Sequence, residues 1–258
     1  MIKEMTMIHP ESSQDKSRLK HTLESNLVTV RKRIALALDR CKEPDREVVI
    51  IAVSKKQPVD KVLMLSSLCQ IHFGESYVQE ALAKMDSAAH CNIKWHFIGG
   101  LQTNKAKYVA GRFALVHSVD SLKLARGLHK KATELNAVQP VLIQVNLAGE
   151  KQKSGILETG LLQLAQDILE MRHLRLEGLM MMPPYTEDPE KSRPLFARTR
   201  ELRDEIEKKL GVNMPQLSMG MSADLEAAVE EGATLVRVGT SLLGHRSGCT
   251  FPSSATAP

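Results

Sequence analysis

From about residue 48 onwards, short apolar runs alternate with amphipathic segments along the chain. The apolar runs are rich in β-branched residues and are typical of strands buried on both faces, whereas the segments between them repeat apolar residues at helical spacing. The predicted strands are 48–54, 70–74, 94–98, 114–118, 139–146, 174–180, 215–219 and 234–239. Each is followed by a predicted helix, at 58–68, 77–88, 102–110, 121–135, 157–170, 189–209, 222–231 and 241–245.

Repeated strand–helix units of this kind predict an α/β fold, a (β/α)₈ TIM barrel. An open doubly wound sheet is the alternative, because a count of strands does not establish that the sheet closes. An extra helix is expected before the barrel over residues 17–41, where Leu19, Leu23 and Leu27 repeat on one side. The chain is therefore divided into a mobile N-terminal extension at 1–16, a barrel at 17–246 and a polar C-terminal tail at 247–258.

Composition narrows the class of protein. The chain is 43% hydrophobic and 25% charged, which is ordinary for a soluble globular protein. No apolar stretch approaches the roughly 18 to 20 residues of a membrane helix, and the first fifteen residues lack the apolar centre of a secretion signal. A cytoplasmic protein without a membrane partner is expected.

Cys41, Cys69, Cys91 and Cys249 are scattered, which predicts reduced thiols and no metal site.

The charge balance favours a small ligand over a nucleic acid. The net charge is +5 and aromatic residues make up 3% of the chain. Nucleic-acid binding usually shows a basic stripe or stacking aromatic residues, and the sequence has neither. A preference for small anionic ligands is the better use of this modest positive charge.

Lys55 directly follows the apolar run of the first predicted strand. In α/β folds the carboxyl ends of the strands carry the ligand sites. The adjacent cation Lys56 and partial burial both favour the neutral amine, which is the form that attacks a carbonyl to give a Schiff base. The alternative is a solvated lysine that opens a strand–helix loop.

Small and polar residues follow the last two predicted strands. Ser218 and Gly220 belong to the first of these turns, and Gly239 and Thr240 to the second. In a barrel, the loops after strands 7 and 8 form a recurrent phosphate site, in which glycines let the backbone approach the anion and hydroxyls donate to it. The alternative is that these glycines serve only the turns themselves.

Arg237 lies within the eighth predicted strand, and its side chain is on the face opposite to those of Val236 and Val238. Its side chain is therefore expected to point into the barrel, where a guanidinium donates hydrogen bonds to an acceptor on the ring of a bound ligand. The alternative is a structural arginine that binds loop carbonyls or a carboxylate.

Several longer motifs resemble one known family. They are AVSKKQP at 52–58, HFGESYVQE at 72–80, WHFIGGLQTNK at 95–105, VHSVDS at 116–121, KSGI at 153–156, EGLMMMPP at 177–184 and LSMGMSADLEAAVEEGATLVRVGTSLLG at 217–244. Together they resemble the YggS/PROSC family of pyridoxal 5′-phosphate (PLP) homeostasis proteins, from about residue 17 to residue 246. The resemblance implies a PLP-binding barrel of fold type III, similar to the amino-terminal domain of alanine racemase.

The resemblance also implies roles for individual residues. Lys55 matches the lysine that forms the Schiff base with PLP, and Arg237 matches the arginine that faces the pyridine nitrogen. The positions that match the phosphate site are Ser218, Met219, Gly220, Gly239 and Thr240. Ser76 is also expected to contact PLP, although it departs from the family, which usually has asparagine close to the cofactor at this position.

The function that the resemblance implies is non-enzymatic: a protein that stores, buffers or delivers PLP, possible recipients being PLP-dependent apo-enzymes, and so maintains vitamin B6 and amino- and keto-acid balance. Arg237 is consistent with this function, because an arginine only donates and leaves the pyridine nitrogen unprotonated, which weakens PLP as an electron sink. Alanine racemase has the same arginine, so this residue alone does not exclude catalysis. A monomer is expected, without the second domain that completes alanine racemase. The alternatives are a weak fold-type III racemase or decarboxylase, and a cofactor-free Schiff-base aldolase.

Overall fold

The computed structural model describes residues 13–41, 43–150 and 154–245. The expected C-terminal tail at 247–258 and residues 1–12 of the expected N-terminal extension lie outside these ranges. Within the described residues, no helix combines the length and the apolar character needed to cross a membrane.

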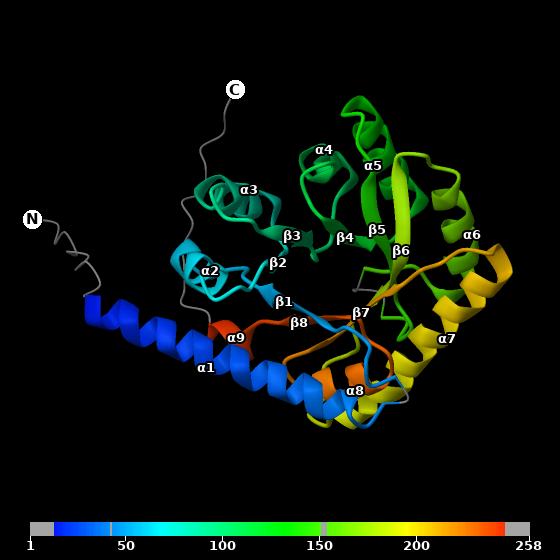
Figure 1. Ribbon diagram of the computed structural model, residues 1–258. Coiled ribbons are helices and arrows are strands. Elements are labelled where there is room, and N and C mark those ends of the chain that lie inside the picture. The colour runs from blue at the N-terminus through cyan, green and yellow to red at the C-terminus, as the bar shows by residue number, and fades with distance from the viewer. Residues whose placement is uncertain (1–12, 42, 151–153, 246–258) are drawn as a thin grey trace, which may run out of the picture.

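Parallel strands form a closed barrel in the order in which they occur along the chain (Figure 1). The first strand pairs with the last, in a register that runs from Val49 opposite Leu235 to Ala52 opposite Val238. This closure confirms the predicted barrel and excludes the open sheet. The strands are β1 (Val49–Val53), β2 (His72–Glu75), β3 (Lys94–Phe97), β4 (Leu115–Val119), β5 (Gln139–Val145), β6 (Leu174–Met181), β7 (Gln216–Met221) and β8 (Leu235–Val238).

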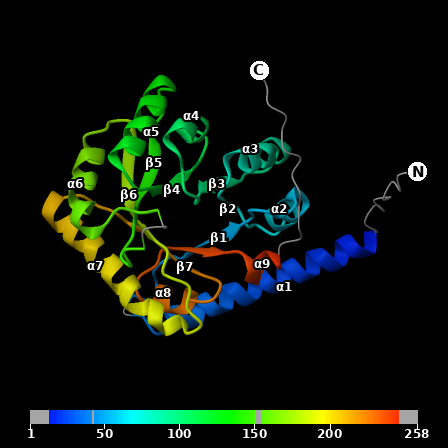
Figure 2. The same ribbon diagram turned by 180° about the vertical axis from the view of Figure 1, so that it is seen from behind.

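Helices surround the barrel, as Figure 2 shows from behind. The first is α1 (Ser13–Leu38), and those after the strands are α2 (Val59–Ser66), α3 (Val78–Ser87), α4 (Ala106–Val109), α5 (Leu122–Glu134), α6 (Glu158–Leu169), α7 (Arg193–Leu210), α8 (Leu225–Glu230) and α9 (Thr240–Leu243). Short 3₁₀ turns, η1 (Thr103–Lys105) and η2 (Pro189–Ser192), precede α4 and α7. The helix predicted at 102–110 is therefore a 3₁₀ turn followed by one short α-helical turn.

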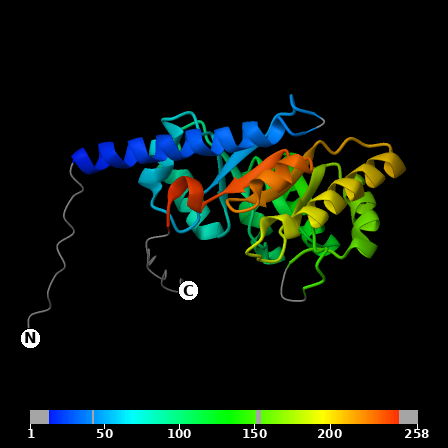
Figure 3. The same cartoon turned by 90° about the horizontal axis from the view of Figure 1, so that it is seen from below.

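Helix α1 begins four residues before its predicted start, so residues 13–16 belong to the helix and not to the extension. Asp15 lies in its first turn, where a carboxylate interacts favourably with the helix dipole. The buried face of α1 is a stripe at helical spacing, made of Leu23, Leu27, Val30, Ile34 and Ala37. This stripe packs along the side of the barrel against α8 and α9 (Figure 3).

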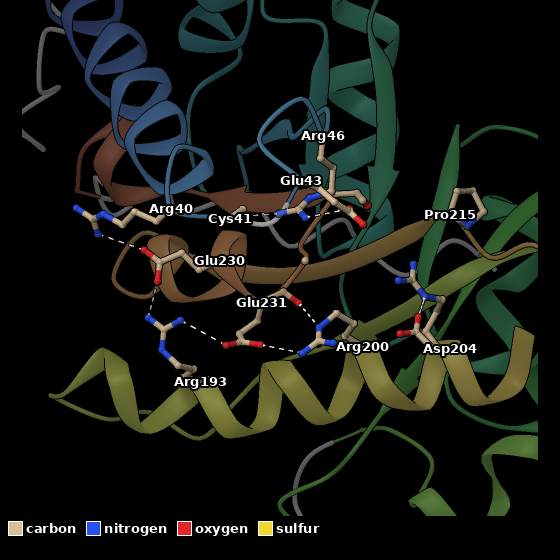
Figure 4. Close-up of a pocket in the computed structure, with 13 residues that line it drawn as sticks. Arg40, Cys41, Glu43, Arg46, Arg193, Arg200, Asp204, Pro215, Glu230 and Glu231 are labelled. Atoms are coloured by element: carbon tan, nitrogen blue, oxygen red, sulfur yellow. Dashed lines mark hydrogen bonds and ion pairs between the residues drawn. The ribbon is translucent and has the colours of Figure 1, made fainter.

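Ion pairs connect the end of α1 to α7 and α8 at the amino-terminal end of the barrel (Figure 4). Glu230 receives Arg40 at 3.2 Å and Arg193 at 2.7 Å, and Glu231 receives Arg200 at 3.1 Å. These residues line a pocket of about 630 Å³. Because these three arginines already have carboxylate partners, we interpret the pocket as part of an ion-pair network that links the segment after α1 to α8, and α8 to α7.

Two apolar layers form the core. The outer layer fills the space between strands and helices and contains the fully buried Phe73 and Phe196. The inner layer fills the centre of the barrel with side chains from five strands, namely Ile51, Leu115, Leu142, Met180 and Leu235. This is the layered interior expected of a TIM barrel, which is a packed core and not a pore.

Three histidines, His72, His96 and His117, also occupy the barrel interior and form a hydrogen-bonded series that we call the imidazole chain. His72 Nδ1 lies 2.8 Å from His96 Nε2, and His96 Nδ1 lies 2.9 Å from His117 Nε2. Burial is the main cause that lowers the pKa of all three, to about 3 for His96 and well below the usual range for His117. All three imidazoles are therefore neutral at pH 7.

This neutrality predicts a loss of stability in mild acid. Below pH 6.5 the unfolded chain protonates His96 while the folded protein does not, until the pH approaches 3. The free energy of unfolding of the wild type should therefore fall with decreasing pH, relative to that of His96→Leu, with a slope that approaches about 1.4 kcal/mol per pH unit near pH 5. Urea unfolding of both proteins at several pH values measures the difference, and parallel curves would contradict a buried neutral His96.

Candidate functional site

The carboxyl ends of the strands define the mouth of the barrel, and here the first and last strand–helix units lie side by side. A Cβ atom added to Gly239 would lie 3.6 Å from Val53 Cβ, so the turn after β8 contacts the end of β1. Gln57 donates to the Gly244 carbonyl at 3.1 Å, and Lys61 donates to the Leu243 carbonyl at 2.8 Å. The structure therefore brings the loop that carries Lys55 next to the predicted phosphate turn.

Lys55 is half-buried in the turn that follows β1. The residues on either side of it are held by buried groups. Ser54 is fully buried and donates its hydroxyl to Glu75 Oε1 at 2.7 Å, while the backbone N–H of Lys56 donates to Glu80 Oε1 at 2.5 Å. Lys56 also has a φ of 58°, a left-handed conformation that is uncommon outside glycine and fixes the turn.

A buried lysine, Lys84 on α3, organises these contacts. Its ammonium donates to the Ser54 carbonyl at 2.6 Å and to one oxygen each of Glu75 and Glu80, both at 2.7 Å. Burial raises the pKa of Glu75, against the opposing effect of Lys84, and Glu75 Oε2 has no hydrogen-bond partner among the described residues. We call these residues, Ser54, Glu75, Glu80 and Lys84, the loop cluster; because it holds both neighbours of Lys55, it fixes the course of the backbone that presents the amine.

Helical periodicity alone gives no reason to place Lys84 and Glu80 at a site. Their spacing of four residues on α3 is typical of a surface ion pair, yet both are buried, with exposed fractions of 4% and 7%. The sequence does contain one feature that could place this pair at the site. Glu75, a carboxylate at the end of a predicted buried strand, comes shortly before the pair and would need a buried cation as its partner. Neither Lys84 nor Glu80 was predicted from the sequence as part of a site.

Arg237 points into the barrel, as predicted. Its exposed fraction is 3%, and its guanidinium donates to Ser218 Oγ at 2.7 Å and to the Met181 carbonyl at 2.9 Å. Burial lowers its pKa to about 10, so it remains a cation at neutral pH. The guanidinium of Arg237 is therefore a cation whose orientation is fixed by its hydrogen bonds. It lies in the barrel interior, two residues before Gly239 at the mouth.

Ser218 has partners other than the predicted phosphate. It is fully buried within β7, and its hydroxyl contacts Arg237 and, at 2.8 Å, His117 Nδ1. Ser222 lies instead at the end of the same segment, half-buried, with its hydroxyl 3.4 Å from the backbone N–H of Ser241. Ser222, which was not predicted from the sequence, thus places its hydroxyl beside the turn after β8 that contains Thr240 and Ser241.

The remaining predicted phosphate residues shape this region in different ways. The Met219 side chain is fully buried in the outer core, so only its backbone is available to a ligand. Gly220 has a φ of 87°, and a Cβ there would lie 2.5 Å from Ala228 Cβ, so only glycine lets the loop pack on α8. Gly239 is half-buried and Thr240 is exposed at the rim.

Ser76 lies on the β2–β3 side of the mouth. It lines a hollow of about 330 Å³ together with Tyr77, Gly100 and Lys105. Its backbone packs closely on the neighbouring loop, since a Cβ added to Gly99 would lie 2.3 Å from the Ser76 carbonyl oxygen. Ser76 is thus at the rim, and its contact with a ligand stays a prediction.

Comparisons with known proteins identify relatives that agree with one another. Residues 25–247 match the family described as the amino-terminal domain of alanine racemase. The chain is 43% identical over 220 residues to the pyridoxal phosphate homeostasis protein of Aquifex aeolicus, which covers 85% of this chain and 96% of that protein. The corresponding protein of Escherichia coli K12 is 37% identical over 229 residues, or 86% of this chain and 95% of its own length.

Solved structures agree with these relatives. PipY of Synechococcus elongatus, in a structure with PLP bound, superposes with a TM-score of 0.77 at 32% identity and covers 86% of this chain and 100% of its own. Alanine racemase of Clostridium difficile shares the fold at 15% identity, with a TM-score of 0.71 over 91% of this chain and 58% of the racemase. The resemblance inferred from the sequence motifs is confirmed: the chain belongs to the pyridoxal phosphate homeostasis protein family.

Proposed function

We propose that this protein binds PLP covalently at Lys55 and serves as a non-enzymatic carrier that stores, buffers or delivers it. The proposal rests on one observation: three kinds of chemical group lie together at the mouth of the barrel. These are a lysine amine on a fixed loop, a turn with hydroxyl and backbone donors, and a buried arginine between them and the barrel interior. The PLP-bound structure of the relative PipY supports the same ligand.

The residues present fit the parts of the PLP molecule. When bound, PLP supplies an aldehyde that condenses with an amine, a phosphate dianion and a pyridine ring. Lys55 would hold the aldehyde carbon, and Ser222 with the backbone of Gly239 and Thr240 would hold the phosphate, since glycines admit a close approach of the anion. Arg237 would donate to the ring nitrogen, because a guanidinium has no acceptor.

Ser218 was predicted as a phosphate ligand, and its contacts favour another role. A hydroxyl already engaged by Arg237 and His117 inside β7 is better placed to hold the arginine than to reach the turn after β8. We therefore assign the phosphate hydroxyl to Ser222 and keep Ser218 as a support for Arg237.

The same residues favour a carrier over a catalyst. An arginine at the ring nitrogen leaves that nitrogen unprotonated and weakens the electron sink on which PLP enzymes depend. A racemase further needs a base on each face of its substrate. Tyr185 is 90% exposed and Tyr77 is 51% exposed, whereas Tyr108 lies under Lys105 and Lys107. None of the three is fixed by burial as a second base would be.

We further propose that the protein works as a monomer in the cytoplasm and passes PLP to apo-enzymes, with no nucleic-acid or membrane partner. The exposure of Thr240 at the rim and the half-exposed Lys55 support exchange with solvent. An anchor that solvent reaches is open to hydrolysis and release, which suits a carrier.

Replacement of Lys55 tests the anchor. The wild type incubated with PLP should develop a visible absorption band that remains with the protein on gel filtration, and Lys55→Ala should lose this band because the proposed anchor amine is removed. Lys56→Ala is the matched control and should keep it. A protein that remains colourless with PLP would contradict the proposed function, and a band that survives in Lys55→Ala would contradict the anchor.

Replacement of Ser222 tests the phosphate assignment. Removal of a hydroxyl that donates to a charged oxygen should weaken PLP binding about tenfold, as measured by absorbance titration. Ser67→Ala, at an exposed serine that bonds only its own helix, is the control. An unchanged affinity in Ser222→Ala would remove this residue from the phosphate site.

Exchange of the alanine α-hydrogen separates the carrier from the racemase. The PLP-loaded protein in deuterium oxide should exchange this hydrogen no faster than free PLP at the same concentration, because none of the three tyrosines discussed above is fixed by burial as a second base. Proton NMR of L-alanine, together with chiral analysis of the product, gives the rate. Exchange well above the free-PLP control, with formation of D-alanine, would favour the enzymatic alternative.

A further inference from the structure

The imidazole chain continues beyond the three histidines to the arginine of the mouth. His117 Nδ1 lies 2.8 Å from Ser218 Oγ, and Ser218 Oγ accepts from Arg237 at 2.7 Å. Strands β4 and β7, which carry His117 and Ser218, are not neighbours in the barrel. Their side chains therefore meet through the interior, and a continuous series of polar groups crosses the barrel from His72 to Arg237.

This series is costly to bury. His96, His117, Ser218 and Arg237 have exposed fractions of 4%, 0%, 0% and 3%, and they share the barrel interior with the apolar inner layer described above. Buried polar groups lose their hydration and are tolerated only when their hydrogen bonds are satisfied. At the end of the series away from Arg237, the half-buried His72 lines a cleft with Arg31 and Glu47.

The direction of the hydrogen bonds follows from the arginine. A guanidinium can only donate, so Ser218 Oγ accepts from Arg237. The one hydroxyl proton of Ser218 then goes to His117 Nδ1, the other group in the described chain within hydrogen-bond distance of it. His117 accordingly carries its proton on Nε2 and donates to His96, which donates in turn to His72.

We propose that His117, with His96 behind it, is a positioning residue that fixes the Ser218 hydroxyl and thereby aims Arg237 at the PLP ring. If the hydroxyl were free to rotate, the proton of Ser218 could turn toward the guanidinium and repel it. With His117 as a fixed acceptor, the lone pairs of Ser218 face Arg237, and the Met181 carbonyl holds the second nitrogen of the guanidinium at 2.9 Å. The proposal rests on the PLP-binding function above and concerns how the ring is held.

Two substitutions at His117 separate its two hydrogen bonds. The side-chain oxygen of His117→Asn lies near the position of Nδ1 and can still accept from Ser218, whereas the amide of His117→Gln reaches the position of Nε2 and contacts only His96. Both cut the imidazole chain once and should destabilise the fold to a similar degree. Only His117→Gln leaves the Ser218 hydroxyl without its acceptor.

The readout is the absorption spectrum of bound PLP as a function of pH, together with the affinity for PLP. His117→Gln should shift the pH midpoint of the spectral change by about one unit and weaken binding about tenfold, the effect of one misdirected hydrogen bond to a charged group. His117→Asn should remain close to the wild type. His129→Gln, at a histidine on α5 that contacts His173, is the control.

The outcomes separate this inference from the proposed function. A wild type that gives no PLP spectrum at all overturns the function itself. A wild-type spectrum that His117→Gln and His117→Asn both retain, with only their urea midpoints lowered, overturns the positioning role. If His117→Gln fails to fold, Ser218→Ala can replace it, because it removes the hydroxyl that accepts from Arg237. Ser218→Ala must then give the same spectral shift, and an unchanged spectrum in that variant also overturns the proposal.

Discussion

The pairing of β1 with β8 is the constraint on which the site depends. Their register from Val49 opposite Leu235 to Ala52 opposite Val238 closes the barrel. Parallel strands end at the same edge of a sheet, so closure places the Lys55 loop against the turn at Gly239, although the two segments come from the first and last units of the barrel. In an open sheet with the same strand order, these groups would lie on opposite edges and could not share one ligand.

Two buried polar networks support the two ends of that site. The loop cluster holds both neighbours of Lys55, while the imidazole chain and Ser218 hold Arg237. Buried charges are stable only with well-directed partners, and apolar residues of similar volume would fill the same space at lower cost. Both networks lie beneath the mouth, where they fix the backbone on either side of Lys55 and the direction of the Arg237 guanidinium.

Much of this arrangement could be predicted from the sequence, and the part that could not has a physical reason. Apolar runs gave the strands, and the rule that strand ends carry ligands selected Lys55 and the turn at Gly239. Periodicity tells which face a side chain occupies, but not which side chains meet across a barrel, because that depends on strand tilt and stagger. The Ser218–His117 contact and the burial of Lys84 therefore could not be predicted, nor could the position of the Ser222 hydroxyl beside the turn after β8.

The central claim, that Lys55 is the covalent anchor for PLP, is tested most directly by mapping the site of attachment. The PLP-loaded protein is reduced with borohydride, digested and analysed by tandem mass spectrometry. The account predicts the phosphopyridoxyl mass on Lys55 in near-stoichiometric yield, with Lys56 and Lys84 unmodified. A label that is spread over surface lysines, or that lies on another single lysine, would contradict it.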